Sequence, residues 1–266
     1  MKLSYPEIRK TCLKPDEGVK PIYARIVTHA ISTRLIWFLQ DAAFSPNAVT
    51  LAGLAAGFAA LPFFAILNPA SVLVGALLIE AYYVLDAMDG QWARLKGAKS
   101  LTGAFFDCLG NYVLQPPILF AIAWGMGSYT REPRFYLLGF TAAFSTLWLL
   151  VMWNLRWSVL LDHFSRKGEA PPRGEGLDHS AEAPEGPAPS LPRRIFSVVH
   201  KTMVFPWFMH VLSLTSLVTW FIGTVFGRDV SLSLFAIFIL YYGLAGPIVA
   251  ALLTAYWILT KKIYQI

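Results

Sequence analysis

The chain has 266 residues, of which 56% are hydrophobic and only 14% are charged, and its mean hydropathy is +0.53. These values exclude an ordinary soluble domain, because too few polar residues are present to cover a surface that faces water. The formal net charge of +6 indicates attraction to anionic head groups or phosphates, and nucleic acid is not expected as a partner.

Residues 1–44 are predicted to form a cytoplasmic segment that precedes the membrane domain. Between Lys20 and Phe44, apolar residues recur at intervals of three and four, which is typical of an amphipathic helix lying along the membrane interface. Ser45-Pro46-Asn47 follows this segment. Since a capping residue followed by proline commonly starts a helix, a new helix is predicted to begin there and to enter the membrane.

Six apolar runs follow and predict an all-α, polytopic membrane domain over residues 45–266 with six transmembrane helices. The runs are Val49–Leu67, Ser71–Leu85, Leu101–Trp124, Phe135–Val159, Thr202–Val225 and Ser231–Leu259. The polar interval over residues 163–194 is rich in Pro, Gly, Ala and Glu and has no periodic apolar face. It is therefore predicted to be a flexible cytoplasmic linker within this domain.

The distribution of basic residues predicts the orientation of the chain. If both termini face the cytoplasm, the outer loops contain only Arg131, Arg134 and Arg228 of the 22 lysines and arginines. The positive-inside rule favours this orientation. We therefore expect an integral protein of the cell (inner) membrane, with the polar stretch from Asp86 to Asn111 at the cytoplasmic surface.

This stretch places oxygen ligands at the ends of two membrane helices. Asp86 and Asp89 are three residues apart, and Asp107 and Asn111 are four apart, so each pair projects from one face of its helix. The short interval around Gly97 predicts a turn and makes the two helices antiparallel neighbours. A cluster of oxygen ligands suits Mg²⁺, Mn²⁺ or Ca²⁺ rather than zinc. Charged groups in membrane helices also indicate a functional site.

Small residues and one cation lie beside these acids. Gly90, Ala93, Gly103 and Ala104 allow either close packing of two membrane helices or the approach of a ligand to bare backbone, and the sequence leaves both interpretations open. Arg94, one helical turn beyond Gly90, adds a cation that can grip a phosphate with paired donors.

The pattern Asp86-x2-Asp89-Gly90-x2-Ala93-Arg94-x8-Gly103-x3-Asp107-x3-Asn111 resembles the signature of the CDP-alcohol phosphotransferase (CDP-alcohol phosphatidyltransferase) family, whose last position is ordinarily Asp. The resemblance implies a membrane transferase of phospholipid biosynthesis and lipid metabolism. Such an enzyme moves a substituted phosphate from a CDP-alcohol donor, such as CDP-diacylglycerol, to the hydroxyl of an acceptor alcohol and releases CMP. The resemblance also implies dependence on Mg²⁺ or Mn²⁺ and a homodimer.

The same resemblance implies roles for single residues. Asp107 and Asn111 take the catalytic positions, and the family's base would stand at position 111, where a carboxamide cannot accept a proton at neutral pH. The implied metal ligands are Asp86, Asp89, Asp107 and Asn111. The implied donor-binding residues are Gly90, Ala93, Arg94, Ser100 and Gly103.

Other interpretations of the same residues stay open. Asn111 is compatible with a weakened enzyme or with a non-catalytic protein that binds a CDP-alcohol, and the membrane acids are compatible with an ion-coupled transporter. Arg193 and Arg194 are predicted to bind a phosphorylated acceptor, such as an inositol or glycerol phosphate, or only to carry positive-inside charge. Glu80, deep in the second apolar run, predicts either a polar cavity or a pairing with a neighbouring helix.

Overall fold

The computed structural model describes residues 2–13, 24–98, 101–167 and 205–259, and every regular element in these ranges is a helix. The all-α prediction is therefore confirmed. The helices are α1 Tyr5–Cys12, η2 Ala24–Thr28, α2 His29–Leu39, α3 Pro46–Ile66, α4 Pro69–Lys96, α5 Leu101–Thr130, α6 Arg134–Lys167, α8 Phe205–Phe226, α9 Arg228–Leu240, η3 Tyr241–Ala245 and α10 Gly246–Leu259.

Four stretches of the described chain are long and apolar enough to cross a membrane. They are Pro46–Ile66, Pro69–Lys96, Arg134–Met152 and Arg228–Ala255, the last of which runs through α9, η3 and α10. These stretches coincide with four of the predicted spans. Helices α5 and α8 occupy the positions of the other two, so the count of six remains a prediction.

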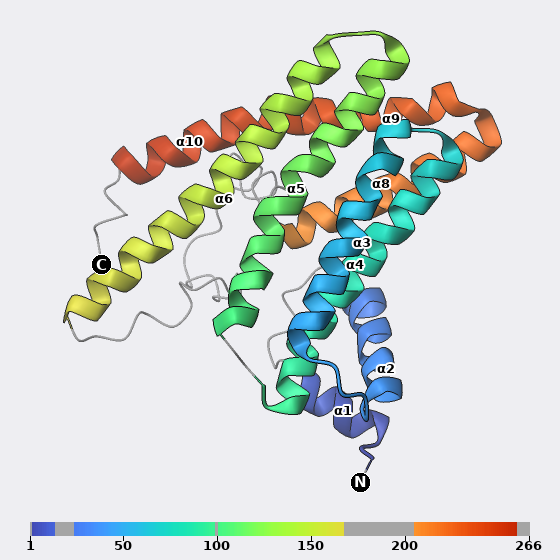
Figure 1. Cartoon of the computed structure of the whole chain (residues 1–266). Coiled ribbons are helices and arrows are strands. Elements are labelled where there is room, and N and C mark those ends of the chain that lie inside the picture. Colours follow the sequence, from blue (N-terminus) through green and yellow to red (C-terminus); the bar gives the residue numbers. More distant parts are fainter. Residues whose placement is uncertain (1, 14–23, 99–100, 168–204, 260–266) are drawn as a thin grey trace, which may run out of the picture.

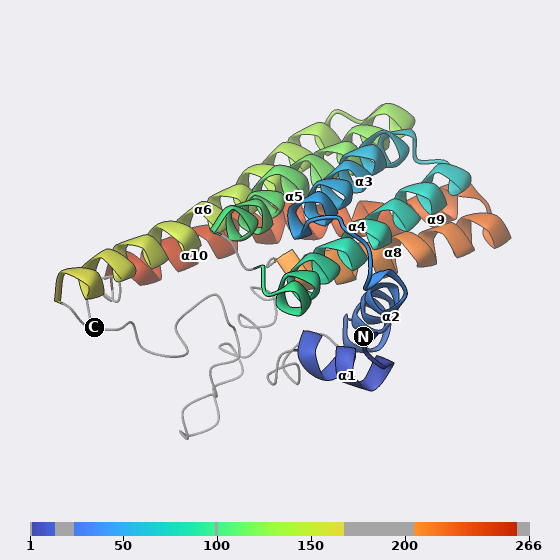
Figure 2. The same cartoon turned by 60° about the horizontal axis from the view of Figure 1, so that its bottom comes forward.

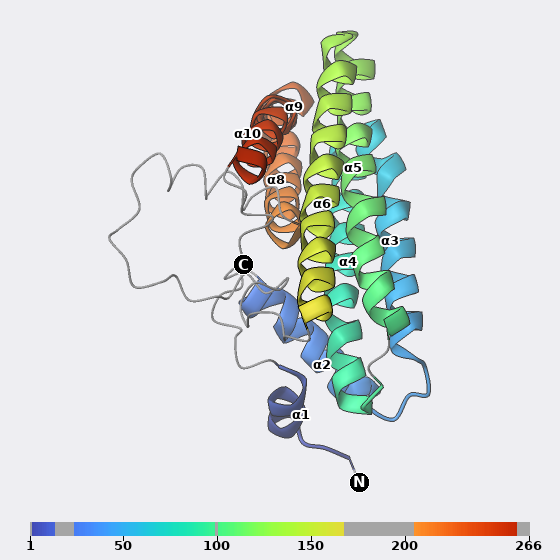
Figure 3. The same ribbon diagram turned by 90° about the vertical axis from the view of Figure 1, so that its left-hand side faces the viewer.

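The long helices lie side by side in one bundle, and α1 and α2 lie at the end of that bundle where α4 finishes (Figures 1 and 2). Helices α8 to α10 form a layer against α4 and α6, as the side view shows (Figure 3). The bundle core is apolar and continuous across both layers. For example, Phe64 on α3 meets Phe235 on α9 edge to face at a centroid distance of 6.2 Å.

Helix α3 lies between the two helices that carry the polar motif. It begins as predicted, because the Ser45 side chain accepts a hydrogen bond from the backbone N–H of Ala48 at 3.2 Å and Pro46 takes the first helical position. A Cβ added at Gly53 would lie 3.3 Å from the Leu85 Cβ on α4, and one at Gly57 would lie 2.5 Å from Leu114 Cδ2 on α5. Glycine on α3 therefore lets both motif helices approach it closely.

The connection between α4 and α5 begins with a turn. Helix α4 ends at Lys96, and Gly97 follows with a φ of +63°, a left-handed conformation that glycine adopts without steric cost. The N–H of Ala98 then donates to the carbonyl of Ala93 at 2.9 Å. Helix α5 runs in the opposite direction to α4 (Figure 1), as the sequence predicted. The two helices were also predicted to be direct neighbours, and this was wrong, because α3 packs against both and lies between them.

The N-terminal segment contains more structure than the sequence predicted. The helical stretch from Ala24 to Leu39 lies within the predicted amphipathic segment. Its Ile31 and Phe38 are exposed, whereas Ser32 and Ile36 are buried, so it has two distinct faces. Its position along a membrane interface remains a prediction. Helix α1 was not predicted, and its Ile8 is fully buried against the rest of the protein.

Two further features refine the predictions made from the sequence. Helix α6 continues to Lys167, into the first residues of the predicted linker, and Arg166 pairs with Asp162 at 2.9 Å near this end. The remainder of that linker lies outside the described residues. Glu80 accepts a hydrogen bond from Ser213 on α8. Of the two interpretations of Glu80, the structure favours pairing with a neighbouring helix.

Candidate active site

The two motif carboxylates of α4, Asp86 and Asp89, lie within about its last three turns, at the end of the bundle near α1 and α2. Asp86 is partly buried and Asp89 is only 8% exposed. The Thr50 hydroxyl on α3 donates to Asp89 Oδ2 at 2.5 Å. This hydrogen bond holds one oxygen of a buried carboxylate in a fixed direction, which is what an ion-binding group needs.

The other half of the motif lies on the first turns of α5, at the same end of the bundle. Asp107 and Asn111 are one helical turn apart on α5, and the structure describes their backbone but not their side chains. Gly110, between them, is close to both neighbouring helices. A Cβ added there would lie 3.1 Å from Tyr82 Oη on α4 and 3.4 Å from Leu54 Cδ2 on α3. This part of α5 therefore lies near the helix that carries Asp86.

The remaining motif residues follow the carboxylates along α4 and begin α5. A Cβ added at Gly90 would lie 3.5 Å from Arg94 Nη1, so the guanidinium lies over the glycine backbone. Arg94 Nε donates to the Cys12 carbonyl at 2.6 Å. Ala93 and Gly103 are partly buried. The predicted site residues Ser100, Arg193 and Arg194 lie outside the described residues.

The described donors are the type that a hard divalent cation takes. Asp86 and Asp89 supply carboxylate oxygens from one face of α4, and carboxylates suit Mg²⁺ and Mn²⁺. Among the side chains that the structure describes, no group of three or more His, Cys, Asp or Glu is gathered tightly enough to hold a metal ion. The side chain of Asp107 is not among those. The donor set on α4 thus fits such a cation, and Asp107 remains the predicted third ligand.

Sequence reasoning missed several residues that support this site. Thr50 is the second residue of the apolar run Val49–Leu67 and the only residue with a hydroxyl group in that run. An isolated hydroxyl in an apolar run is a signal that could have identified it. Gln91 is fully buried and bonds to α2, although its position in a polar stretch gave no sign of this. Cys12 packs with the end of α4, where burial raises the pKa of its thiol and the nearby Arg94 offsets part of that effect.

Comparison with known proteins supports the resemblance found in the motif. Residues 43–170 match the model of the CDP-alcohol phosphatidyltransferase family. The chain is also 41% identical over 70 residues to an archaetidylinositol phosphate synthase of Aeropyrum pernix, and the alignment covers 26% of this chain and 34% of that protein. The chain thus matches about a third of the length of this relative.

The matched region contains α3, α4, α5 and all of α6, and it therefore includes every residue of the motif. Members of this family are generally dependent on a divalent metal ion, in agreement with the oxygen donors on α4. Residues 43–170, which hold the motif and the helices that position it, are thus similar to the CDP-alcohol phosphatidyltransferase family.

Proposed function

We propose that this protein is an integral membrane transferase that joins a CDP-alcohol donor, such as CDP-diacylglycerol, to an acceptor alcohol in the presence of Mg²⁺ or Mn²⁺. The acceptor oxygen forms a bond to the phosphorus that carries the donor's alcohol. The bond from this phosphorus to the oxygen of CMP breaks, CMP leaves with that oxygen, and the proton of the acceptor hydroxyl is released to water. The observation that carries the proposal is the pair Asp86 and Asp89 on one face of α4, at the end where the motif stretch of α5 begins.

The residues of α4 supply orientation and charge for this reaction. Asp86, Asp89 and the predicted ligand Asp107 would hold the cation, which when bound offsets charge on the diphosphate and on the departing CMP. Gly90 places no side chain of its own toward the donor, and the Arg94 guanidinium beside it provides a cation for the donor's phosphates. Thr50 holds the Asp89 carboxylate in place.

The acceptor is proposed to be a phosphorylated polyol, such as an inositol phosphate. The name of the Aeropyrum relative, an archaetidylinositol phosphate synthase, supports this class. The basic residues Arg193 and Arg194 would bind the acceptor's phosphate. We further propose that both termini and the site face the cytoplasm and that the protein is a homodimer.

The experiment that tests the proposal offers a panel of acceptor alcohols together with labelled CDP-diacylglycerol and measures CMP, with and without Mg²⁺. The purified protein in detergent or nanodiscs should release CMP only with metal, and fastest with a phosphorylated polyol. Arg193→Ala and Arg194→Ala should raise the KM for that acceptor far more than the KM for the donor. Equal effects on both values would contradict the acceptor site, and metal-independent CMP release would contradict the proposed chemistry.

Asn111 favours a second candidate, a protein that binds a CDP-alcohol without turning it over. A carboxamide cannot act as a base, so the chain as it stands would be slow or inactive unless another group accepts the proton. Asn111→Asp restores a carboxylate at this position and should increase CMP release by about 100-fold or more, as for a typical general base. If neither form releases CMP from any acceptor but both bind CDP-diacylglycerol with Mg²⁺, the second candidate is favoured. Good turnover by the unaltered chain with no gain in Asn111→Asp would refute the missing-base explanation.

A further inference from the structure

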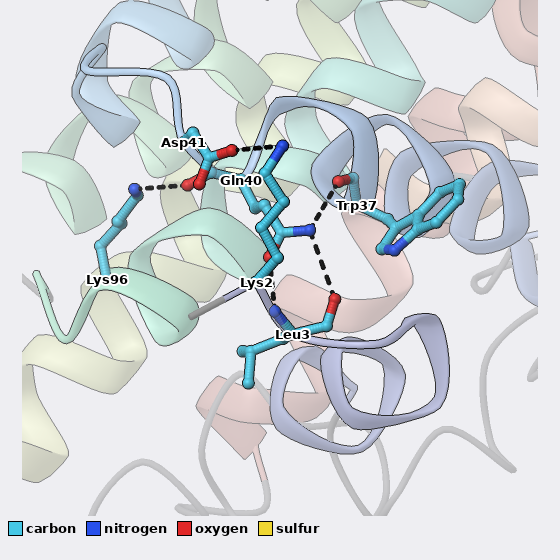
Figure 4. A network of polar contacts seen from close by, with 6 residues as sticks. All are labelled: Lys2, Leu3, Trp37, Gln40, Asp41 and Lys96. Carbon is cyan, nitrogen blue, oxygen red and sulfur yellow. Dashed lines mark hydrogen bonds and ion pairs between the residues drawn. The ribbon is translucent and has the colours of Figure 1, made fainter.

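The last two turns of α4, directly after the motif carboxylates, are held by side-chain hydrogen bonds to the N-terminal segment. Trp92 Nε1 donates to the Phe44 carbonyl at 3.2 Å, and Lys96 Nζ donates to the Gln40 carbonyl at 2.8 Å. Gln40 also bonds to the backbone of Leu3, at 2.8 Å through its Oε1 and at 3.3 Å through its Nε2 (Figure 4). The segment before the membrane domain therefore encloses the end of the motif helix.

The most deeply buried of these links is made by Gln91. Its side chain is 0% exposed and reaches α2. Ser32 and Thr33 donate to Gln91 Oε1 at 3.1 and 3.4 Å. Gln91 Nε2 lies 2.9 Å from His29 Nδ1, within hydrogen-bond distance of this ring nitrogen. A buried amide with three partners of this kind is costly to disturb, because each group left unpaired has lost its contact with water.

Gln91 and Asp89 hold α4 from opposite sides. Residues two apart on an α-helix point about 200° apart, so Asp89 faces α3 and its partner Thr50 while Gln91 faces α2. Two hydrogen-bonded contacts on opposite faces fix the rotation of a helix about its own axis. Side chains reach about 5–6 Å from that axis, so a rotation of about 20° would move a carboxylate by about 2 Å. Metal–oxygen distances tolerate only about 0.2 Å.

We propose that Gln91 is a positioning residue, which through His29, Ser32 and Thr33 sets the rotation of α4 that aims Asp86 and Asp89 at the divalent cation. This inference rests on the proposed function, since it assumes that these carboxylates bind a metal ion. Gln91 itself faces α2, away from the Asp89 carboxylate, which faces α3. Its effect is therefore expected in the affinity for the cation, and this affinity can be measured without turnover.

The test separates positioning from stability with two variants of the full chain. Gln91→Leu keeps the approximate size of the side chain but removes the amide that lies beside the His29 ring. His29→Leu combined with Gln91→Leu removes both buried polar groups, while Ser32 and Thr33 keep their bonds to the backbone carbonyl of residue 29, at 3.3 and 2.5 Å. Because matched apolar pairs restore stability, the double variant should recover most of the Tm that the single variant loses.

Mn²⁺ affinity is measured from the electron paramagnetic resonance signal of free Mn²⁺ during titration of the protein in nanodiscs. Both variants should show a Kd for Mn²⁺ raised about 10-fold or more, the effect expected when a residue that orients metal ligands is lost. Thr146→Val serves as the control, because Thr146 is a buried hydroxyl on α6 whose hydrogen bond among the described residues is to the Ala142 carbonyl of its own helix. This variant should leave the Kd unchanged.

The outcomes distinguish this inference from the proposed function. A Kd that stays raised in the double variant after its Tm has recovered supports positioning. A Kd that equals the value of the unaltered protein in Gln91→Leu, or that recovers together with Tm in the double variant, would show that Gln91 is only structural and would overturn the inference. If the unaltered protein itself binds no Mn²⁺, the metal-dependent function fails first, and the inference fails with it.

Discussion

The hydrogen bond from Thr50 to Asp89 makes the sharpest prediction about the site. Thr50→Val removes the hydroxyl and keeps the branched shape, so the packing of α3 against α4 is retained. Both residues are buried, 6% and 8% exposed, and the bond is short at 2.5 Å. Water can therefore not easily replace the lost donor.

The expected change in Mn²⁺ affinity follows from the free energy of the hydrogen bond between Thr50 and Asp89. A hydrogen bond to a charged acceptor contributes about 1.5–3 kcal/mol, which corresponds to about 10- to 150-fold in an equilibrium constant. We therefore expect Thr50→Val to raise the Kd for Mn²⁺ by about 10- to 100-fold, in the range known for partners that orient metal ligands. Thr50→Ser keeps the hydroxyl and should bind within about threefold of the unaltered protein.

The assay is a Mn²⁺ titration of the two Thr50 variants beside Asp89→Asn, which removes the ligand itself. We expect Mn²⁺ to bind most tightly to the unaltered protein, then to Thr50→Ser, then to Thr50→Val, and most weakly to Asp89→Asn. If Thr50→Val binds Mn²⁺ as tightly as the unaltered protein while Asp89→Asn does not bind it, then the hydrogen bond from Thr50 does not orient Asp89 for metal binding. This result would refute the prediction.

Two further predictions concern regions away from the carboxylates. Arg228 donates from Nε to the Leu67 carbonyl at 2.9 Å and from Nη2 to the Ile66 carbonyl at 3.0 Å, so it caps the C-terminal end of α3. Arg228→Ala should lower the Tm in a thermal unfolding assay by several degrees and Arg228→Lys by less, and equal Tm values for all three forms would contradict the capping role. The Glu7 carboxylate accepts bonds from the Ser4 hydroxyl and N–H, which lower its pKa. The resulting stabilisation of α1 is fully present above pH 4.5, the ordinary pKa of the carboxyl group, and is lost as the pH falls through the lowered pKa of Glu7. The rate of amide hydrogen exchange in α1, corrected for its intrinsic pH dependence, should therefore increase over this pH range. Ser4→Ala should remove most of this pH effect, and an unchanged profile would refute it.

The sequence predicted the parts of the fold that local patterns determine. Ser45-Pro46 marked the start of α3, and the interval around Gly97 marked the turn that brings the two motif stretches to one end of the bundle. The spacing of Asp86 and Asp89 predicted a shared helix face, because that relation depends only on helix geometry. These features follow from residues within a few positions of one another.

The sequence could not predict contacts between distant segments. His29 and Gln91 are 62 residues apart, and neither position belongs to a periodic pattern that links them. Helix α1 is stabilised by burial of Ile8 against the end of α4, which no local signal reveals. Its capping box, Ser4 with Glu7, was nevertheless visible in the sequence and could have indicated a short helix.

The link between Glu80 and Ser213 has a consequence for how the polypeptide is assembled. Together with the bonds from Arg228 to the end of α3, it fastens α8 and α9 directly onto the helices of the first half. These contacts join the two halves independently of the chain that connects them. Two separately translated fragments, divided within residues 168–204 and produced in the same membrane, therefore carry the contacts they need to find each other and to reconstitute the bundle.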